Sequence, residues 1–271
     1  MMRKLVNPPH QWSLFDTVGQ TDCETKPPAI EFDPDKLTDQ EIIEQIPKAK
    51  LSNIKLLCEQ IEDRNLDDKA VPALLSLWNR YKGFGLVQPL LEQRLALQTL
   101  LAINTSDAKD TLYKIITEPN VPDSLLPTVL ETAIGFKLKL TLRQIMPWLK
   151  HEMPIIRALA FSLMQYANPP LDVLEIGLSD PEASVRKSAL ITMGNLGHED
   201  AREGLMAEFG KNPTGQTAKA LFAVADDDVI TRLGRYAIEN QKLRKLIANE
   251  LNYIDNPKAT KIAKRIQDHL T

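Results

Sequence analysis

A recurrence of about 30 residues constrains the fold of this chain more than any other feature. From about Thr38 onward the sequence is a succession of amphipathic segments of 9 to 16 residues, separated by Asp, Asn, Ser, Thr or Pro. Residues 185–190 (VRKSAL) resemble residues 156–161 (IRALAF), which lie 29 residues upstream, and residues 93–97 (QRLAL) fall about three periods back. Two helices in such a repeat cannot bury their apolar faces alone. The pattern therefore predicts antiparallel helix pairs stacked into a right-handed, curved α-solenoid.

Helix starts along the chain support this all-α prediction. Thr38 and Glu41 are spaced as a capping box, in which each side chain serves a backbone N–H of the other residue. Asp180 precedes Pro181, and Asn256 precedes Pro257, so each pair supplies a cap and a proline for the first helical position. Alternating β-branched runs and Asn-Gly hairpin signals are missing. We expect fourteen or fifteen short helices and no sheet.

The segment from Asp180 to Leu190 (DPEASVRKSAL), followed by MGNLG at residues 193–197, resembles the HEAT-repeat family, in particular its short bacterial members. In that family the residues that match Asp180, Val185 and Arg186 open the second helix of a repeat. The resemblance implies that the Asp and the Arg can link adjacent repeats. It covers roughly residues 70–270, and the other copies match less well, because His151 stands where the Asp is expected in the copy before Arg157. The resemblance implies an architecture and no particular activity.

A Pro-rich leader precedes the helical part, with five of the eighteen prolines in the first 34 residues. Such segments are usually extended. We therefore divide the chain into a leader, residues 1–36, and a HEAT-like solenoid, residues 37–271. Within the leader stands Gln11-Trp12-Ser13-Leu14-Phe15, of the form QxxLF.

This pentapeptide resembles the motif by which bacterial replication and repair proteins dock on the sliding DNA clamp. Leu14 and Phe15 would enter an apolar pocket, and the Gln11 amide would donate and accept hydrogen bonds beside it. In the alternative interpretation, Trp12, Leu14 and Phe15 fold back onto the first helices as an apolar staple.

The overall composition restricts the binding partners and the cellular compartment that we expect for the protein. A net charge of −3 and a pI of about 5.9 give no general attraction to nucleic acid. Two cysteines, Cys23 and Cys58, form neither a disulfide framework nor a metal-ligand spacing, which favours a reducing compartment. Neither a signal peptide nor a membrane span is recognisable, so we expect a cytoplasmic protein that does not enter a membrane.

Motifs for catalysis or cofactor binding are weak. Residues 210–217 (GKNPTGQT) only approach a phosphate-binding loop, because Gln216 replaces its lysine and the preceding segment is helical in pattern. The three carboxylates of residues 226–228 are better explained as a helix cap than as a cation site. The four histidines are scattered singly. We expect no catalytic residue, no metal and no cofactor.

Basic residues concentrate at the end of the chain. Between residues 242 and 271 there are seven bases and three acids, whereas residues 172–228 hold eleven acids and five bases. Lys258, Lys261, Lys264 and Arg265 recur at helical spacing and share one face. They are candidate phosphate contacts. The competing interpretation, which we favour, is the solvated face of a terminal capping helix.

Three functions remain open. The first is a non-enzymatic scaffold or adaptor that binds a protein partner through the solenoid and is tethered to the clamp through Gln11–Phe15. The second is a HEAT-like protein-binding module unrelated to replication. The third is a DNA-repair enzyme similar to the HEAT-like alkylpurine DNA glycosylases, with Trp78, Tyr81, Trp148 and Tyr166 as candidate aromatics. The acidic net charge argues against this third function and against direct nucleic-acid binding.

Overall fold

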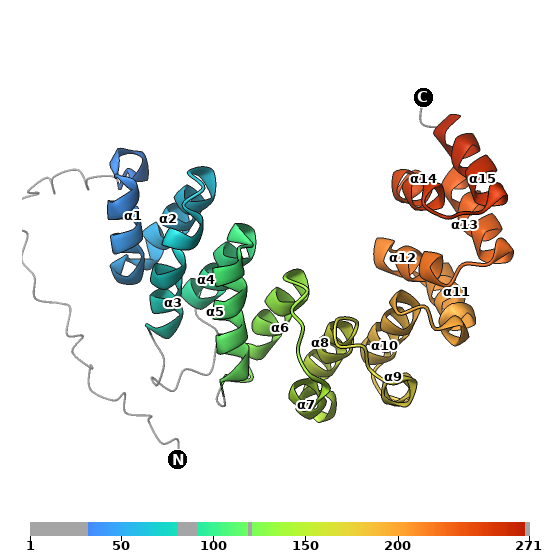
Figure 1. Ribbon diagram of the computed structural model, residues 1–271, viewed down its shortest axis with the longest axis horizontal. Coiled ribbons are helices and arrows are strands. Elements are labelled where there is room, and N and C mark those ends of the chain that lie inside the picture. Colours follow the sequence, from blue (N-terminus) through green and yellow to red (C-terminus); the bar gives the residue numbers. More distant parts are fainter. Residues whose placement is uncertain (1–31, 81–90, 119–120, 269–271) are drawn as a thin grey trace, which may run out of the picture. The chain divides into compact units, whose positions relative to one another are not determined.

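The computed structural model describes residues 32–80, 91–118 and 121–268 (Figure 1). They belong almost entirely to one compact unit, Pro34–Thr271, while the residues up to Asp33 form a second unit. The described residues form fifteen α-helices and five short 3-10 helices joined by turns, and no strand occurs among them. The prediction of an all-α fold with fourteen or fifteen helices is confirmed.

Most of the α-helices span two to four turns. Their bounds are α1 Asp39–Gln45, α2 Leu51–Asp63, α3 Val71–Asn79, α4 Leu91–Ile103, α5 Ser106–Thr117, α6 Leu126–Gly135, α7 Leu142–Ile145, α8 Pro154–Met164, α9 Leu171–Leu178, α10 Ala183–Asn195, α11 Arg202–Lys211, α12 Gly215–Ala223, α13 Asp227–Glu239, α14 Arg244–Asn252 and α15 Pro257–Asp268. The 3-10 helices are η1 Pro34–Lys36, η2 Ile46–Lys48, η3 Asp67–Lys69, η4 Met146–Lys150 and η5 Glu199–Ala201.

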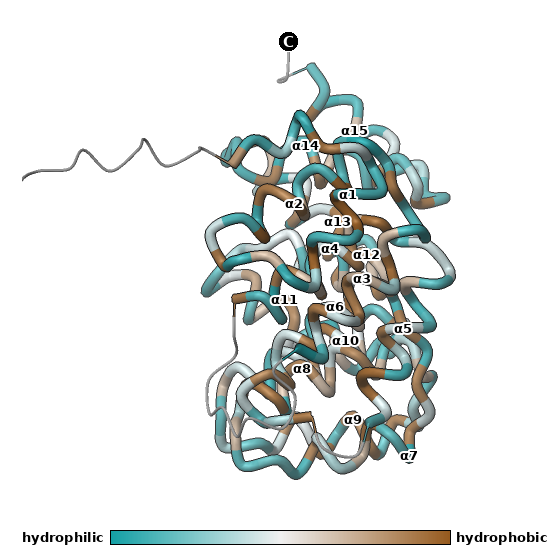
Figure 2. The backbone as a smooth tube through the Cα atoms, turned by 90° about the vertical axis from the view of Figure 1, so that its left-hand side faces the viewer, coloured by the Kyte–Doolittle hydropathy of each residue, from teal (hydrophilic) through white to brown (hydrophobic). Residues whose placement is uncertain are grey.

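The helices contact one another in the order of the chain. Each even-numbered helix from α2 to α12 packs on the next even-numbered helix, and most helices also pack on the one that follows them. Apolar residues make these contacts because they recur at helical spacing. In α10, for example, Val185, Ala189 and Met193 are buried at intervals of four residues. In Figure 2, which colours the backbone by hydropathy, short hydrophobic and hydrophilic stretches alternate along the chain.

Three predicted helix caps are present. The Thr38 hydroxyl accepts from the backbone N–H of Glu41, whose carboxylate accepts from the Thr38 N–H at 2.8 Å. Asn256 Oδ1 accepts from the first turn of α15, and Asp226 Oδ1 accepts from the first turn of α13. The start predicted at Asp180 is wrong by two residues, since α10 begins at Ala183 with Glu182 as its N-cap.

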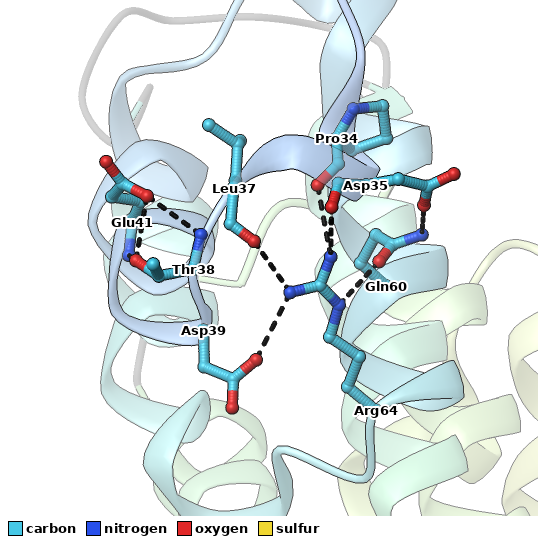
Figure 3. Close-up of polar contacts among 8 residues, drawn as sticks. All are labelled: Pro34, Asp35, Leu37, Thr38, Asp39, Glu41, Gln60 and Arg64. Carbon is cyan, nitrogen blue, oxygen red and sulfur yellow. Dashed lines mark hydrogen bonds and ion pairs between the residues drawn. The ribbon is translucent and has the colours of Figure 1, made fainter.

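Arg64, at the end of α2, holds the first residues of the compact unit (Figure 3). Its guanidinium donates to the carbonyl oxygens of Leu37 at 2.7 Å and Pro34 at 3.2 Å, and its Nε donates to Gln60 Oε1. Gln60 in turn donates to Asp35 Oδ1 at 2.8 Å. One cation therefore binds the Leu37 carbonyl, which follows η1, and adds a second hydrogen bond to the Pro34 carbonyl, which also accepts from the Leu37 backbone N–H.

Candidate functional site

A groove of about 620 Å³ lies across α6, α8, α10 and α12. Each of the four helices contributes side chains to its lining. The lining residues are Glu131 and Ile134 from α6; Ile155, Ala158, Leu159, Ser162, Gln165 and Tyr166 from α8 and its end; Ser184, Lys187, Ser188, Ile191, Thr192 and Asn195 from α10; and Gln216 and Lys219 from α12.

The repeat explains why α8 and α10 form the centre of this groove. In α8 the lining side chains of Ile155, Leu159 and Ser162 lie four and three residues apart. In α10, Ser184, Ser188 and Ile191 have the same spacing and follow them by 29 residues. Because i, i+4 and i+7 share one face of a helix, the two helices present equivalent faces side by side.

The groove is lined by both apolar and hydrogen-bonding side chains. Ile155 is 45% exposed, which is unusual for an isoleucine in a packed helix, and Leu159 and Ile191 are half-buried. At the C-terminal ends of α8 and α10, Asn195 Nδ2 donates to Gln165 Oε1 at 3.1 Å, so that two side-chain amides on neighbouring helices are joined. The side-chain amide oxygen of Asn195, Oδ1, has no hydrogen-bond partner among the described residues.

Tyr166 and Thr192 both bring a hydroxyl group to the groove, but the two hydroxyls have different roles. Burial raises the pKa of the Tyr166 phenol, so the hydroxyl stays neutral and can both donate and accept at physiological pH. Thr192 is buried, and its hydroxyl donates to the Phe161 carbonyl at 3.0 Å. Tyr166 is thus available to a ligand, whereas Thr192 ties α10 to α8 beneath it.

Charge is placed at the two ends of the groove. Glu131 on α6 and Lys219 on α12 are both exposed, and neither has an ion-pair partner within the described part of the chain. Lys187, near the middle, is neutralised by Glu208 at 2.8 Å. Since α6 packs on α8, α8 on α10 and α10 on α12, the unpaired acid and the unpaired base belong to the opposite ends of this series.

The lining chemistry suits binding. It offers hydroxyls, amides and aliphatic surface, and its only carboxylate is Glu131. No group of three His, Cys, Asp or Glu side chains able to hold a metal ion occurs in the described ranges. Among those residues, too, no helix combines the length and apolar character needed to cross a membrane.

A second, larger concavity of about 830 Å³ is acidic, with Glu199, Asp200, Glu203, Asp226 and Asp228 in its lining. Most of these carboxylates already have partners. Arg202 pairs with Glu199 at 3.3 Å and with Asp226 at 3.4 Å, and Arg232 pairs with Asp228 at 2.8 Å. The sequence indicated the acidity of this region, and the structure accounts for it by local ion pairs and by the helix cap of Asp226.

The residues of the HEAT-like motif lie at the start of α10, with Asp180 on the turn before the helix and Val185 and Arg186 in its first turn. Asp180 receives two hydrogen bonds from Arg157 of α8, at 2.8 and 2.9 Å. Arg186 donates instead to the backbone carbonyls of Asp180 and Pro181, both at 2.7 Å. Val185 is fully buried. Asp180 is therefore joined to α8 by Arg157, the arginine of the preceding copy of the repeat, and not by the Arg186 side chain.

The candidate phosphate contacts all lie exposed on α15. Lys258 is engaged by the start of α13, because its ammonium donates to the Asp227 carbonyl at 3.1 Å and lies 3.7 Å from the Asp227 carboxylate. Lys261, Lys264 and Arg265 form no side-chain hydrogen bond or ion pair with any residue in the described part of the chain.

The clamp motif, Gln11–Phe15, lies outside the described residues, as does Tyr81. Of the other candidate aromatics, Trp78 is buried in α3 and Trp148 is half-buried in η4, so only Tyr166 lines the groove. Residues 210–217, which only approach the sequence of a phosphate-binding loop, join the end of α11 to α12, whose first turn is capped by Thr214.

No protein-family model matches this sequence, and a search of curated proteins finds no significant match. Function must therefore be argued from the residues themselves. The sequence did not single out the groove, although the 29-residue offset between its polar and aliphatic side chains on α8 and α10 was a usable signal.

Proposed function

We propose that this chain is a protein-interaction scaffold: an α-solenoid of HEAT-like repeats that binds a partner protein in the groove across α6, α8, α10 and α12. The serial packing of the even-numbered helices supports the solenoid interpretation, because each pair buries its apolar face against its neighbours. The residue that carries the proposal is Ile155, an aliphatic residue that stays 45% exposed in a groove lined by both aliphatic and hydrogen-bonding side chains. Concave surfaces with apolar patches and a few placed polar groups are where ligands bind.

The second part of the proposal concerns the leader. Gln11, Leu14 and Phe15 have the spacing of the bacterial clamp-docking motif, and the sequence before Pro34 is rich in proline. A flexible chain of about twenty residues spans roughly 25 Å on average. Docking of this peptide on a sliding clamp would therefore leave the helical unit room to hold a second protein. Together the two sites would make the protein an adaptor.

The groove is tested by affinity purification from a bacterial lysate followed by quantitative mass spectrometry. Ile155→Glu places a charge in the groove at an exposed position, so the fold should tolerate it. Ile176→Glu is the matched control, because Ile176 is also exposed, at 59%, and lies on α9 outside the groove. A partner that is retained by the native protein and the Ile176 variant but lost with the Ile155 variant supports the proposal. Equal retention by all three proteins would refute a role for the groove.

The leader is tested separately in the same assay. Removal of residues 1–33 should abolish recovery of the sliding clamp and leave the groove partner bound. Clamp recovery that survives this deletion would contradict the tether and leave a binding module without a link to replication.

A further inference from the structure

We propose that the groove takes an extended peptide segment, with a basic side chain at its α6 end and an acidic side chain at its α12 end. This inference rests on the proposed function and adds the conformation and charge pattern of the partner. Two observations carry it: hydrogen-bonding groups that lie among the aliphatic side chains of the groove, and opposite, unpaired charges on its first and last helices.

The hydrogen-bonding groups favour an extended ligand over a helical one. A helix satisfies its own N–H and C=O groups and offers a groove mainly an apolar stripe. An extended segment leaves those groups open, and they need partners once they are buried. The groove supplies such partners from its two middle helices: the side-chain amide oxygen of Asn195, at the end of α10, can accept from a peptide N–H, and the hydroxyl of Tyr166, just after α8, can donate to a peptide carbonyl.

Small side chains allow the peptide backbone to come close. Ala158 and Ser162 on α8, and Ser184 and Ser188 on α10, line the groove between the larger aliphatic residues. Alternate side chains of an extended segment point to opposite sides. One set would contact Ile155, Leu159 and Ile191, and the other would face solvent.

The length of the segment follows from the four helices it must cross. Packed helices lie about 8–10 Å apart, so three steps from α6 to α12 amount to about 24–30 Å. At about 3.3 Å per residue, this requires roughly eight residues. The charged residues of the partner should therefore stand about six to eight positions apart.

Charge complementarity sets the direction of the segment across the groove. Lys219 would pair with an acidic side chain and Glu131 with a basic one, whereas Lys187 is already neutralised by Glu208 and contributes no preference. Peptides in the reverse orientation would place like charges together at both ends, which is unfavourable.

The test is selection from a random dodecapeptide display library against the full-length protein. The expected consensus carries one basic and one acidic residue separated by about six to eight positions, with alternating aliphatic residues between them. Selection is repeated with Lys219→Glu and with Glu131→Lys. The first variant should enrich peptides with a base at both ends, and the second should enrich peptides with an acid at both ends. A native-selected peptide should bind the Lys219 variant at least tenfold more weakly.

The possible failures are distinguishable. Peptides whose binding is unaffected by Ile155→Glu, or no enrichment at all, would defeat the proposed function together with this inference. Peptides that need the groove but show apolar residues at i, i+3, i+4 and i+7 would indicate a helical partner and overturn the inference alone. An unchanged charge pattern in both charge-reversal variants would do the same.

Discussion

Arg157 on α8 and Asp180 before α10 form an ion pair closed by two hydrogen bonds, from Nε to Oδ2 at 2.8 Å and from Nη2 to Oδ1 at 2.9 Å. The two side chains are only 12% and 11% exposed. The third nitrogen of the guanidinium donates to the carbonyls of His151, at 2.8 Å, and Glu152, at 3.0 Å. One arginine thus fastens the turn before α8 to the turn before α10.

Removing this pair should destabilise the protein. We predict that Asp180→Ala lowers the free energy of unfolding by about 2 kcal/mol, because a largely buried guanidinium loses its anion. Arg157→Lys alone should lower it by less, because an ammonium keeps the opposite charge but cannot form two parallel bonds to the carboxylate. Arg186→Ala should cost less, about 1 kcal/mol, because Arg186 is exposed and serves only carbonyls. Urea denaturation measures all three, and an Arg186 effect larger than that of Asp180 would contradict this assignment.

Low pH should weaken the ion pair between Arg157 and Asp180. The hydrogen bonds from Arg157 hold the pKa of Asp180 below its ordinary value, and the backbone N–H of Val229 does the same for the pKa of Asp226. A carboxyl with a lowered folded-state pKa contributes stability that is complete above its unfolded pKa of about 4 and is lost as the pH falls through the folded value. Urea midpoints should therefore fall between pH 5 and pH 3. Asp180→Asn should show a shallower fall, and an unchanged slope would argue against the linkage.

Gly177 on α9 allows three helices to approach closely. A Cβ added there would lie 2.5 Å from the Ala189 Cβ of α10 and 2.6 Å from Phe161 Cζ of α8. Gly177→Ala should therefore destabilise the protein by about 1–3 kcal/mol through overpacking, although alanine favours helix. Ala189→Leu should be destabilising for the same reason. Gly210→Ala on α11 is the control, because nothing lies within 4 Å of its added Cβ, and it should be neutral or stabilising. Thermal midpoints in the reverse order would refute the packing.

The Cys58 thiol should be unreactive in the folded protein. It is 3% exposed, and burial raises its pKa to about 11. Because the thiolate is the reactive form, about one thiol in a thousand would be ionised at pH 8. A Cys23→Ser variant isolates this residue. Its reaction with a disulfide reagent should be at least a hundredfold slower in buffer than in 6 M guanidinium, and equal rates would show that α2 is open.

The sequence was sufficient for what depends on local chemistry. The capping residues Thr38, Asn256 and Asp226 act within their own first turns, so their roles were readable from spacing alone. Arg157 and Asp180 lie 23 residues apart, and only the packing of α8 beside α10 brings them together. The HEAT-repeat resemblance implied that Asp180 and Arg186 can link adjacent repeats, whereas the Arg186 guanidinium turns back to the carbonyls of the preceding turn.

The groove could not be predicted from the sequence for a related reason. Ile155 and Ile191 stand in helices that also bury aliphatic residues, and residue type alone does not distinguish an aliphatic side chain that faces a neighbouring helix from one that lines an open concavity. The pairing of Gln165 with Asn195 also requires two helices to lie side by side. Arg64 shows the same limit, because the carbonyls that it binds precede it by 27 and 30 residues.

The adaptor role is tested most directly by titration calorimetry of the full-length protein with a bacterial sliding clamp, in parallel with a Leu14→Ala, Phe15→Ala double variant. We predict a Kd in the micromolar range for the native protein, or about −7 to −8 kcal/mol, which two apolar anchors can supply after a flexible segment is ordered. The double variant should show no measurable heat, while Ser13→Ala should bind nearly as well as the native protein. Equal binding by the native protein and the double variant, or binding by neither, would contradict the clamp tether.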